Sequence, residues 1–240
     1  NWVADIADRR FGYLQIPLLF FILVLCRIGR IQVAWFIHND VSHTKKNWRT
    51  KKFIRRMMMI FADKVFTHSH ELSIIPKLPH IRVHHHPVEK MQQLDAPAVF
   101  EYDALIWGSV SPYKGVLDFA RFNYSCARMT DLRIMVTGKF ISPAFFGQVS
   151  RYAKANIQFV DRVAEESDLA DLFKKSRCVI FCYRSASVLS SAALCKTLSY
   201  GKTVLGPNVG AFRELGRKGL IYTYDSFEEL ADKLHALKIS

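Results

Sequence analysis

The sequence predicts an α/β fold with parallel sheets, and three observations support this prediction. Short apolar segments alternate with helical segments over residues 104–237, which is the pattern of strands joined by crossover helices. Hydrophobic residues make up 50% of the chain, which is enough for a sizeable core and too many for a disordered protein. The 240 residues leave room for one large domain or two modest ones.

The alternation is most regular from residue 104 onward. Strands are predicted at 104–107, 132–137, 157–160, 178–182, 203–205 and 220–223. Helices are predicted near 115–128, 143–154, 166–175, 189–200, 211–216 and 226–237. In parallel sheets of this kind, ligands bind beyond the carboxyl ends of the strands. The loops that follow the strands are therefore expected to carry the functional residues.

The first part of the chain is predicted to form a smaller unit of the same kind. Predicted elements are a helix at 11–28, a strand at 31–37, a basic amphipathic helix at 48–61, and short strands at 65–67 and 81–84. The inner side of the basic helix is expected to carry Phe53, Met57, Ile60 and Phe61. A polar connection with proline follows, so we predict domains at 1–90 and 101–240 with a linker at 91–100.

One apolar run, Ile16–Cys26, interrupts the first unit. Its 11 residues fall short of the roughly 20 needed to span a bilayer. A buried helix is the first interpretation, and a helix lying on a membrane surface is the second.

The chain is strongly basic, with 34 Lys and Arg against 21 Asp and Glu and a net charge of +13. The cluster of basic residues consists of Lys45, Lys46, Arg49, Lys51, Lys52, Arg55 and Arg56. Such a run attracts anionic lipid, nucleic acid or a polyanionic substrate, but it is also compatible with a solvated helix face. The five cysteines are scattered without zinc spacing, and their odd number argues against a disulfide framework. Reduced thiols and a cytoplasmic location are expected.

Two glycine-containing loops follow predicted strands. Gly108 to Gly115 holds Ser111 and Lys114, and Gly138-Lys139 follows the next strand. Glycines allow close backbone approach, and lysines at neighbouring strand ends would converge on a phosphate. An ordinary turn with a solvated lysine is the alternative.

A third loop leads from an apolar strand into a helix. It contains Arg184, Ser190 and Ser191. The unpaired N–H groups and the dipole at a helix start suit an anion, and the hydroxyl and guanidinium groups add donors. Small residues at this place also let a helix pack closely on a sheet, and both interpretations can hold together.

Histidines gather at strand ends in the first unit. His38-Asn39 ends one strand, His43 follows, and His84 to His86 comes before Pro87. A strand-end histidine is more often a structural hydrogen-bonding residue than a catalyst. No carboxylate or cysteine completes a metal site, so none is predicted.

Together these segments resemble the family-4 retaining glycosyltransferases of the GT-B fold, most closely the branch that builds bacterial surface polysaccharides. The resemblance rests on Trp35–His43, on Phe61–Ser69 with Val83–Pro87, on Trp107–Gly115, and on Tyr183–Gly210. It covers most of the chain.

The resemblance implies two facing Rossmann-like domains, the N-terminal one incomplete, with a UDP- or GDP-sugar in the C-terminal one. It implies His38 and Lys114 as catalytic residues, with Lys114 neutralising the donor diphosphate and His38 facing the donor sugar. The donor site would add Gly108, Ser111, Lys139, Arg184, Ser190, Ser191 and Glu214, and the acceptor side would hold Asn39, His43 and His86. The reaction would be hexosyl transfer with retention to a glycan or lipid-linked acceptor, without a metal or other cofactor. Independently of the resemblance, the basic helix 48–61 suggests peripheral contact with anionic membrane near a lipid-linked acceptor.

The chain departs from the family pattern at several places. Ser109 stands where the family often has arginine. Val188 and Lys196 stand where it has a pair of glutamates that hold the sugar and the ribose, and Glu214 is a weak substitute. The family has further elements at both ends, so we expect this chain to be truncated. Two alternatives stay open: a non-catalytic basic module that binds nucleotide or nucleic acid, and a GT-B sugar-nucleotide epimerase.

Overall fold

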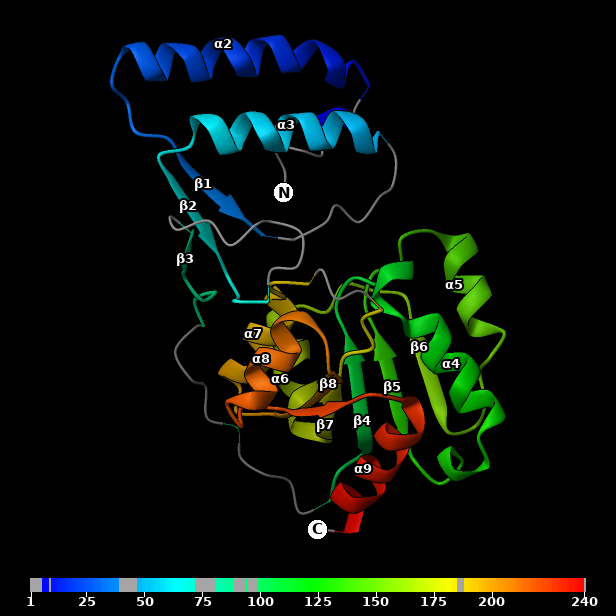
Figure 1. Ribbon diagram of the computed structural model, residues 1–240. Helices are drawn as coiled ribbons and strands as arrows, with labels where there is room; N and C mark the ends of the chain where they lie inside the picture. The colour runs from blue at the N-terminus through cyan, green and yellow to red at the C-terminus, as the bar shows by residue number, and fades with distance from the viewer. Residues whose placement is uncertain are drawn as a thin grey trace. The chain divides into compact units, whose positions relative to one another are not determined.

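The computed structural model describes residues 6–8, 10–38, 47–71, 81–88, 94, 99–184 and 188–239. The chain forms two compact units (Figure 1). Unit 1 comprises residues 1–86 with 187–190, and unit 2 comprises residues 87–186 with 191–240. Both units are built from parallel strands and helices, as the sequence predicts.

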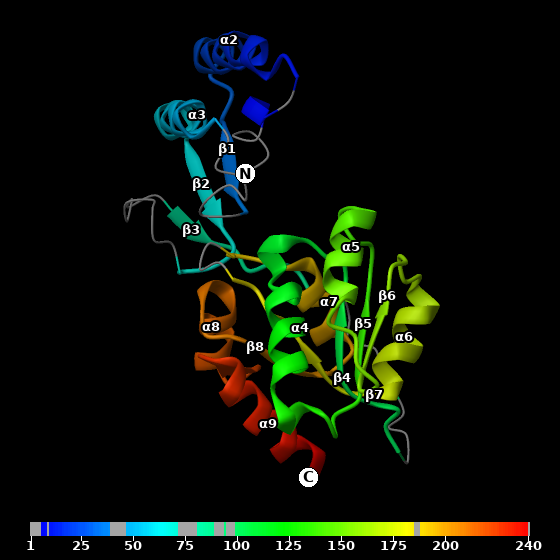
Figure 2. The same ribbon diagram turned by 90° about the vertical axis from the view of Figure 1, so that its right-hand side faces the viewer.

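Unit 1 contains a parallel sheet in the order β1-β2-β3. The strands are β1 (Ala34–Ile37), β2 (Lys64–Thr67) and β3 (Ile81–Val83). Two 3₁₀ turns, Ile6–Asp8 and Gly12–Leu14, precede helix α2 (Gln15–Ile28), and α3 (Trp48–Phe61) connects β1 to β2. Helices α2 and α3 lie side by side (Figures 1 and 2), where Phe20 and Phe61 meet edge to face at 5.8 Å.

The basic helix α3 has the predicted bounds but a different buried side. Ile54, Met57 and Met58 are buried, whereas Phe53 is 57% exposed and Ile60 is 71% exposed. The expected inner side was therefore wrong for Phe53 and Ile60. Ile54, Met57 and Met58 pack into the core of unit 1, and Lys51 on the same side of the helix is buried, where its ammonium pairs with Asp8 at 2.5 Å.

Unit 2 is a doubly wound sheet in the order β6-β5-β4-β7-β8-β9. The strands are β4 (Tyr102–Trp107), β5 (Ile134–Thr137), β6 (Ile157–Val160), β7 (Ser176–Ile180), β8 (Thr203–Pro207) and β9 (Tyr222–Tyr224). When the strands are numbered from β4, their order in the sheet is 3-2-1-4-5-6. Successive strands are added on one side of β4 up to β6 and on the other side from β7 onward, so the strand order switches between β4 and β7. Ligands of such sheets bind at this switch point.

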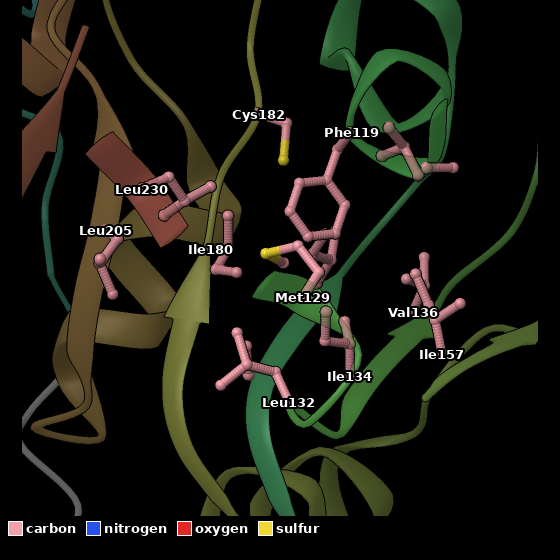
Figure 3. Close-up of a cluster of buried hydrophobic side chains, with 14 of the residues drawn as sticks. Phe119, Met129, Leu132, Ile134, Val136, Ile157, Ile180, Cys182, Leu205 and Leu230 are labelled. Carbon is pink, nitrogen blue, oxygen red and sulfur yellow. The ribbon is translucent and has the colours of Figure 1, made fainter. Parts of the chain in front are cut away.

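Helices cover both faces of the unit 2 sheet. They are α4 (Val116–Ser125), α5 (Pro143–Ser150), α6 (Glu166–Lys175), α7 (Ala192–Ser199), α8 (Gly210–Arg217) and α9 (Phe227–Ile239), with 3₁₀ turns at Pro112–Lys114 and Ala127–Met129. Helices α4, α5 and α9 share one buried cluster with the sheet, in which Phe119 packs against Met129 and Ile134 (Figure 3). On the other face Phe173 of α6 meets Trp107 edge to face at 5.5 Å, and Phe212 of α8 lies 5.5 Å from Phe181.

Two glycines let the loops beyond β4, β5 and β7 touch through their backbones. Gly115 has φ +71°, and a Cβ there would lie 1.9 Å from the Cys182 carbonyl oxygen. Gly138 has φ +148°, and a Cβ there would lie 1.7 Å from the Gly108 carbonyl oxygen. Any side chain at either position would be strained and would force the adjoining backbone to shift.

We expect Gly115→Ala and Gly138→Ala to lower the free energy of unfolding by about 2 kcal/mol or more, because each adds left-handed strain and a backbone clash. Gly147→Ala is the matched control, since a Cβ there meets nothing within 4 Å and the residue lies inside α5. This control should stabilise by about 0.5–1 kcal/mol. Urea unfolding of the three variants checks the prediction, and equal effects would contradict it.

Candidate functional site

The loop after β4 places Lys114 at the switch point of unit 2. Gly108, with φ +99°, turns the chain out of the strand, and Lys114 ends the 3₁₀ turn before α4. A Cβ added to Gly108 would lie 3.7 Å from Lys114 Nζ and 3.7 Å from the Ala193 side chain. The ammonium group therefore lies beside the Gly108 backbone, close to the first turn of α7.

Lys114 carries a partly buried charge in the loop after β4. Burial lowers the pKa of its ammonium group to about 8, and Nζ lies 5.6 Å from the centre of the Tyr183 ring. Within the described part of the chain, no carboxylate pairs with it. A partly buried cation of this kind favours an anionic ligand, which would restore the protonated form.

The start of α7 adds hydrogen-bond donors beside Lys114. Ser191 caps the helix, because its Oγ accepts from the Leu194 N–H at 3.2 Å, and the same Oγ lies 3.1 Å from the Tyr183 hydroxyl. The first N–H groups of a helix have no partner inside it, and Ser191 Oγ satisfies only one of them. Within the described ranges no hydrogen bond engages the N–H groups of Ala192 and Ala193, and N–H groups at this place in a helix suit an anion.

Two buried hydroxyl groups lie near the ends of β4 and β5. They belong to Ser111, which is 9% exposed, and Thr137, which is 2% exposed. The Ser111 side chain lies within hydrogen-bonding reach of the Tyr113 hydroxyl, whereas Thr137 Oγ1 has no hydrogen-bond partner in the described ranges. Buried polar atoms are normally paired, so the Thr137 oxygen is available to a bound ligand or water. Nearby, Trp107 donates to Thr197 Oγ1 at 2.8 Å, which links the end of β4 to α7.

The other predicted cations are neutralised by carboxylates of unit 2. Lys139 pairs with Asp161 at 3.2 Å, and Arg184 Nε pairs with Asp118 at 2.7 Å. The side chain of Lys139 is directed to the end of β6, so a convergence of its ammonium group with that of Lys114 stays a prediction. Lys139 and Arg184 therefore lack the uncompensated charge that distinguishes Lys114, and their donor-binding roles stay predictions.

Three further residues from the sequence prediction have other surroundings. Glu214 is buried on α8 and pairs with Lys218 at 2.9 Å. Ser190 belongs to unit 1, whereas Ser191 belongs to unit 2. Their donor-binding roles stay predictions.

A carboxylate lies beside Lys196 although the family's glutamate is missing there. Glu166 of α6 accepts from Lys196 Nζ and from the Tyr200 hydroxyl, both at 2.6 Å. Val188, at the other departure from the family pattern, is buried.

A separate pocket of about 310 Å³ opens where β7, β8 and β9 end. Its walls include Tyr183, Asp225 and the ion-paired Arg184 and Asp118. Two carboxylates against one neutralised guanidinium make this pocket a poor site for a diphosphate, in contrast to the surroundings of Lys114.

In unit 1, histidines meet at the carboxyl ends of the three strands. His38 follows β1, and the buried His68 follows β2. His38 Nδ1 lies 3.0 Å from His68 Nε2. The ring of His86 lies 5.3 Å from the ring of His68, centre to centre. Asn39 and His43 lie outside the described residues. His68 received no role from the sequence, although a histidine directly after a buried strand was a usable signal.

The histidine cluster is not arranged as a metal site. In the described ranges, no group of three His, Cys, Asp or Glu side chains has the geometry to hold a metal ion.

The buried His68 should make stability depend on pH below about 6.5, the ordinary pKa of histidine. Burial lowers the pKa of His68. The hydrogen bond to the His84 carbonyl raises this pKa, and the charges of His86, His84 and His85 lower it. Unfolded histidine, with its pKa of 6.5, then binds protons more readily than the folded protein. The contribution of neutral His68 to the free energy of unfolding is fully present above pH 6.5. It is lost as the pH falls through the lowered pKa of the folded protein.

We therefore expect the melting temperature to fall between pH 7 and pH 5, and to fall less in His68→Gln. Carboxylates with lowered pKa values, such as Asp131, titrate below this window from a reference pKa of 3.8. Thermal unfolding followed by circular dichroism measures the effect. A melting temperature that rises on acidification to pH 5 would contradict the sign.

Comparison with known proteins gives structural matches only. No protein-family model matches the chain. No curated protein matches it by sequence. Anabaena HepE, solved in complex with UDP, superposes with a TM-score of 0.66 at 15% identity, over 91% of this chain and 65% of HepE.

Two other solved structures agree with this match. TarM of S. aureus gives a TM-score of 0.63 at 12% identity, over 86% of this chain and 43% of TarM. WaaG, a glycosyltransferase involved in lipopolysaccharide biosynthesis, gives 0.61 at 12% identity, over 86% of this chain and 66% of WaaG. The chain thus spans less than two thirds of the length of HepE and TarM. The two parallel α/β units and these matches show that the chain has the fold of the GT-B glycosyltransferases.

Proposed function

We propose that this chain is part of a glycosyltransferase that moves a sugar from a nucleoside diphosphate to an acceptor hydroxyl. The observation that carries the proposal is the unneutralised Lys114 ammonium beside the start of α7 at the switch point of unit 2. A diphosphate leaving group needs such a combination of cation and helix N–H groups. The matches to glycosyltransferases, among them HepE with UDP-glucose at 16% identity, support the same reading through the fold.

The proposed step is largely electrostatic. The bond between the anomeric carbon and the diphosphate oxygen breaks, and a bond from that carbon to the acceptor oxygen forms. The acceptor proton passes to an oxygen of the leaving diphosphate. Lys114 and the N–H groups of Ala192 and Ala193 stabilise the negative charge as it develops. Attack from the side of the leaving group would retain the anomeric configuration, which is the finer part of the proposal.

A contact of His38 with the donor sugar is a further part of the proposal, and it comes from the sequence resemblance. The His38 ring is exposed at the end of β1, next to a sheet edge where ligands of parallel sheets bind. An acceptor in a surface glycan and a donor hexose are further parts of the proposal, and they rest on the sequence resemblance alone. A cytoplasmic site of action is also proposed, from the scattered cysteines that lack a disulfide framework.

Binding of UDP by Lys114 variants tests the proposal. We expect Lys114→Ala to weaken UDP binding at pH 7 by about tenfold to a hundredfold, the value of a hydrogen bond between charged groups. Above about pH 8 the wild type should also lose affinity, because the ammonium then loses its proton. Calorimetric titration at pH 7 and pH 9 measures both effects.

Two controls sharpen the test. Lys114→Arg keeps a permanent charge, so its affinity should change less with pH than that of the wild type. Lys139→Ala removes a lysine that Asp161 already neutralises, so a change below about threefold is expected. Equal losses in Lys114→Ala and Lys139→Ala would reject the assignment. GDP in place of UDP identifies the base, and radiolabelled donor separates transfer from epimerisation.

A second proposal concerns the surface of unit 1 formed by α2 and α3. Exposed side chains of α2 include Leu18, Phe21 and Leu25, which are 58%, 57% and 48% exposed. The adjacent α3 exposes Arg49, Lys52 and Arg56. No helix in the described ranges is long and apolar enough to cross a bilayer. We propose that this surface lies on anionic membrane, with the apolar side chains in the lipid and the basic ones at the headgroups.

Sedimentation with vesicles tests this second proposal. Vesicles that contain phosphatidylglycerol should bind the chain more tightly than phosphatidylcholine vesicles, and salt should weaken the binding. The double variant Lys52→Gln with Arg56→Gln should bind about tenfold or more weakly, at about 1 kcal/mol per basic residue. Arg151→Gln with Lys174→Gln removes the same charge from exposed positions in unit 2. Equal losses in both double variants would show a net-charge effect without a surface on unit 1.

A further inference from the structure

Three histidine-bearing loops of unit 1 form a hydrogen-bonded series at the carboxyl ends of β1, β2 and β3. His68 Nδ1 lies 2.9 Å from the carbonyl oxygen of His84, and His68 Nε2 lies 3.0 Å from His38 Nδ1. The backbone at this place is fixed by the ladder between β2 and β3, which continues in a hydrogen bond from the His84 N–H to the Thr67 carbonyl at 2.7 Å. The order of atoms is therefore carbonyl, His68 ring, His38 ring.

The carbonyl decides where His68 carries its proton. A carbonyl oxygen only accepts hydrogen bonds, so His68 Nδ1 must be the donor. In a neutral imidazole one nitrogen carries the proton and the other is an acceptor. Neutral His68 consequently presents Nε2 as an unprotonated acceptor.

The same logic passes to His38. Because His68 Nε2 is an acceptor, the 3.0 Å contact is a hydrogen bond only when His38 Nδ1 donates. Neutral His38 then has its proton on Nδ1 and leaves Nε2 unprotonated. His38 is exposed, whereas His68 is 8% exposed, so the chain of assignments runs from the buried carbonyl to an accessible ring nitrogen.

The neutral forms on which these assignments depend are favoured by the surroundings. Burial lowers the pKa of His68, and the partial desolvation of one side of the otherwise exposed His38 ring lowers the pKa of His38; the neighbouring His86 ring lowers both further. A doubly protonated His68 would donate from Nε2 and would reverse the assignment of His38. The packing of Phe36 against His38 and His68, with ring centres 6.2 and 5.6 Å apart, adds apolar surroundings that disfavour that state.

We propose that His68 is a positioning residue that holds His38 in the Nδ1–H tautomer, so that His38 Nε2 accepts a hydrogen bond from a ligand hydroxyl. The tautomer is a property of the chain itself, and the hydroxyl rests on the proposed glycosyltransferase function. An isolated imidazole prefers the opposite tautomer, in which Nε2 donates. We call the series of His84 carbonyl, His68 ring and His38 ring the relay. With the relay, His38 Nε2 recognises a ligand group that donates a hydrogen bond, whereas the opposite tautomer would recognise one that accepts.

Nitrogen-15 NMR of the histidine-labelled 240-residue chain at pH 7.5 tests the proposal directly. Long-range nitrogen–proton correlations distinguish the two neutral tautomers for each ring. The expected result is an Nδ1–H tautomer for both His38 and His68. A His38 ring that carries its proton on Nε2 would overturn the proposal.

Variants at position 68 separate positioning from simple packing. His68→Leu fills the space without a polar atom, so His38 should shift toward the Nε2–H tautomer. His68→Gln can offer a carbonyl oxygen to His38 while its amide donates to His84, so the Nδ1–H tautomer should persist. His70→Ala is the control, because it removes a histidine of the same loop that has no place in the relay. An unchanged His38 signal in His68→Leu would contradict the role of His68, and the wild-type spectrum decides the question if that variant does not fold.

The outcomes separate this inference from the function on which part of it rests. In a transfer assay, His68→Leu should lower kcat/KM by about tenfold, the value of one lost hydrogen bond, and His68→Gln should restore most of it. If His38 has the Nδ1–H tautomer but the chain binds no UDP, the positioning role of His68 is supported and the glycosyltransferase function is rejected. Measured transfer with an Nε2–H tautomer would keep the transferase and reject the relay.

Discussion

The pairing of β4 with β7 is the constraint on which the candidate site of unit 2 depends. These strands are far apart in the sequence, yet Ala104 lies opposite Cys178 and Leu105 lies opposite Val179. Because the chain winds outward from this pair in both directions, the loops after β4 and β7 turn to opposite faces of the sheet. The space between them receives Lys114 from one loop and the start of α7 from the other.

The electrostatics of this space differ from those of its surroundings. Lys139 and Arg184 occupy neighbouring strand ends and are neutralised by Asp161 and Asp118. Lys114 is more deeply desolvated and has no such partner in the described ranges, which lowers its pKa from 10.5 to about 8. This difference corresponds to about 3 kcal/mol that disfavours the ammonium form in the empty site. An anion that restores the charge can recover this energy on binding, so the site is arranged for a ligand more than for stability.

Much of the fold could be predicted from the sequence, because apolar periodicity determines which segments are buried. Helix 48–61 and strand 157–160 have their predicted bounds. The contacts that define the site could not be predicted in the same way. Arg184 meets Asp118 through pairing of strands that periodicity does not specify. Likewise, the ion pair that Lys51 forms with Asp8 on the buried side of α3, opposite the exposed Phe53, joins residues 43 positions apart in the sequence. A loop motif in the sequence pointed to Lys114. The lack of a carboxylate partner for it in the described ranges could be recognised only from the three-dimensional structure.

The two close backbone approaches in unit 2 have a consequence for how such a protein diverges. Gly115 against Cys182 and Gly138 against Gly108 join the strand-end loops through main-chain atoms, which every residue shares. Selection then has to preserve a few glycines, while the side chains around them are free to drift. A site held in this manner can keep its shape while most of the side chains around it are replaced.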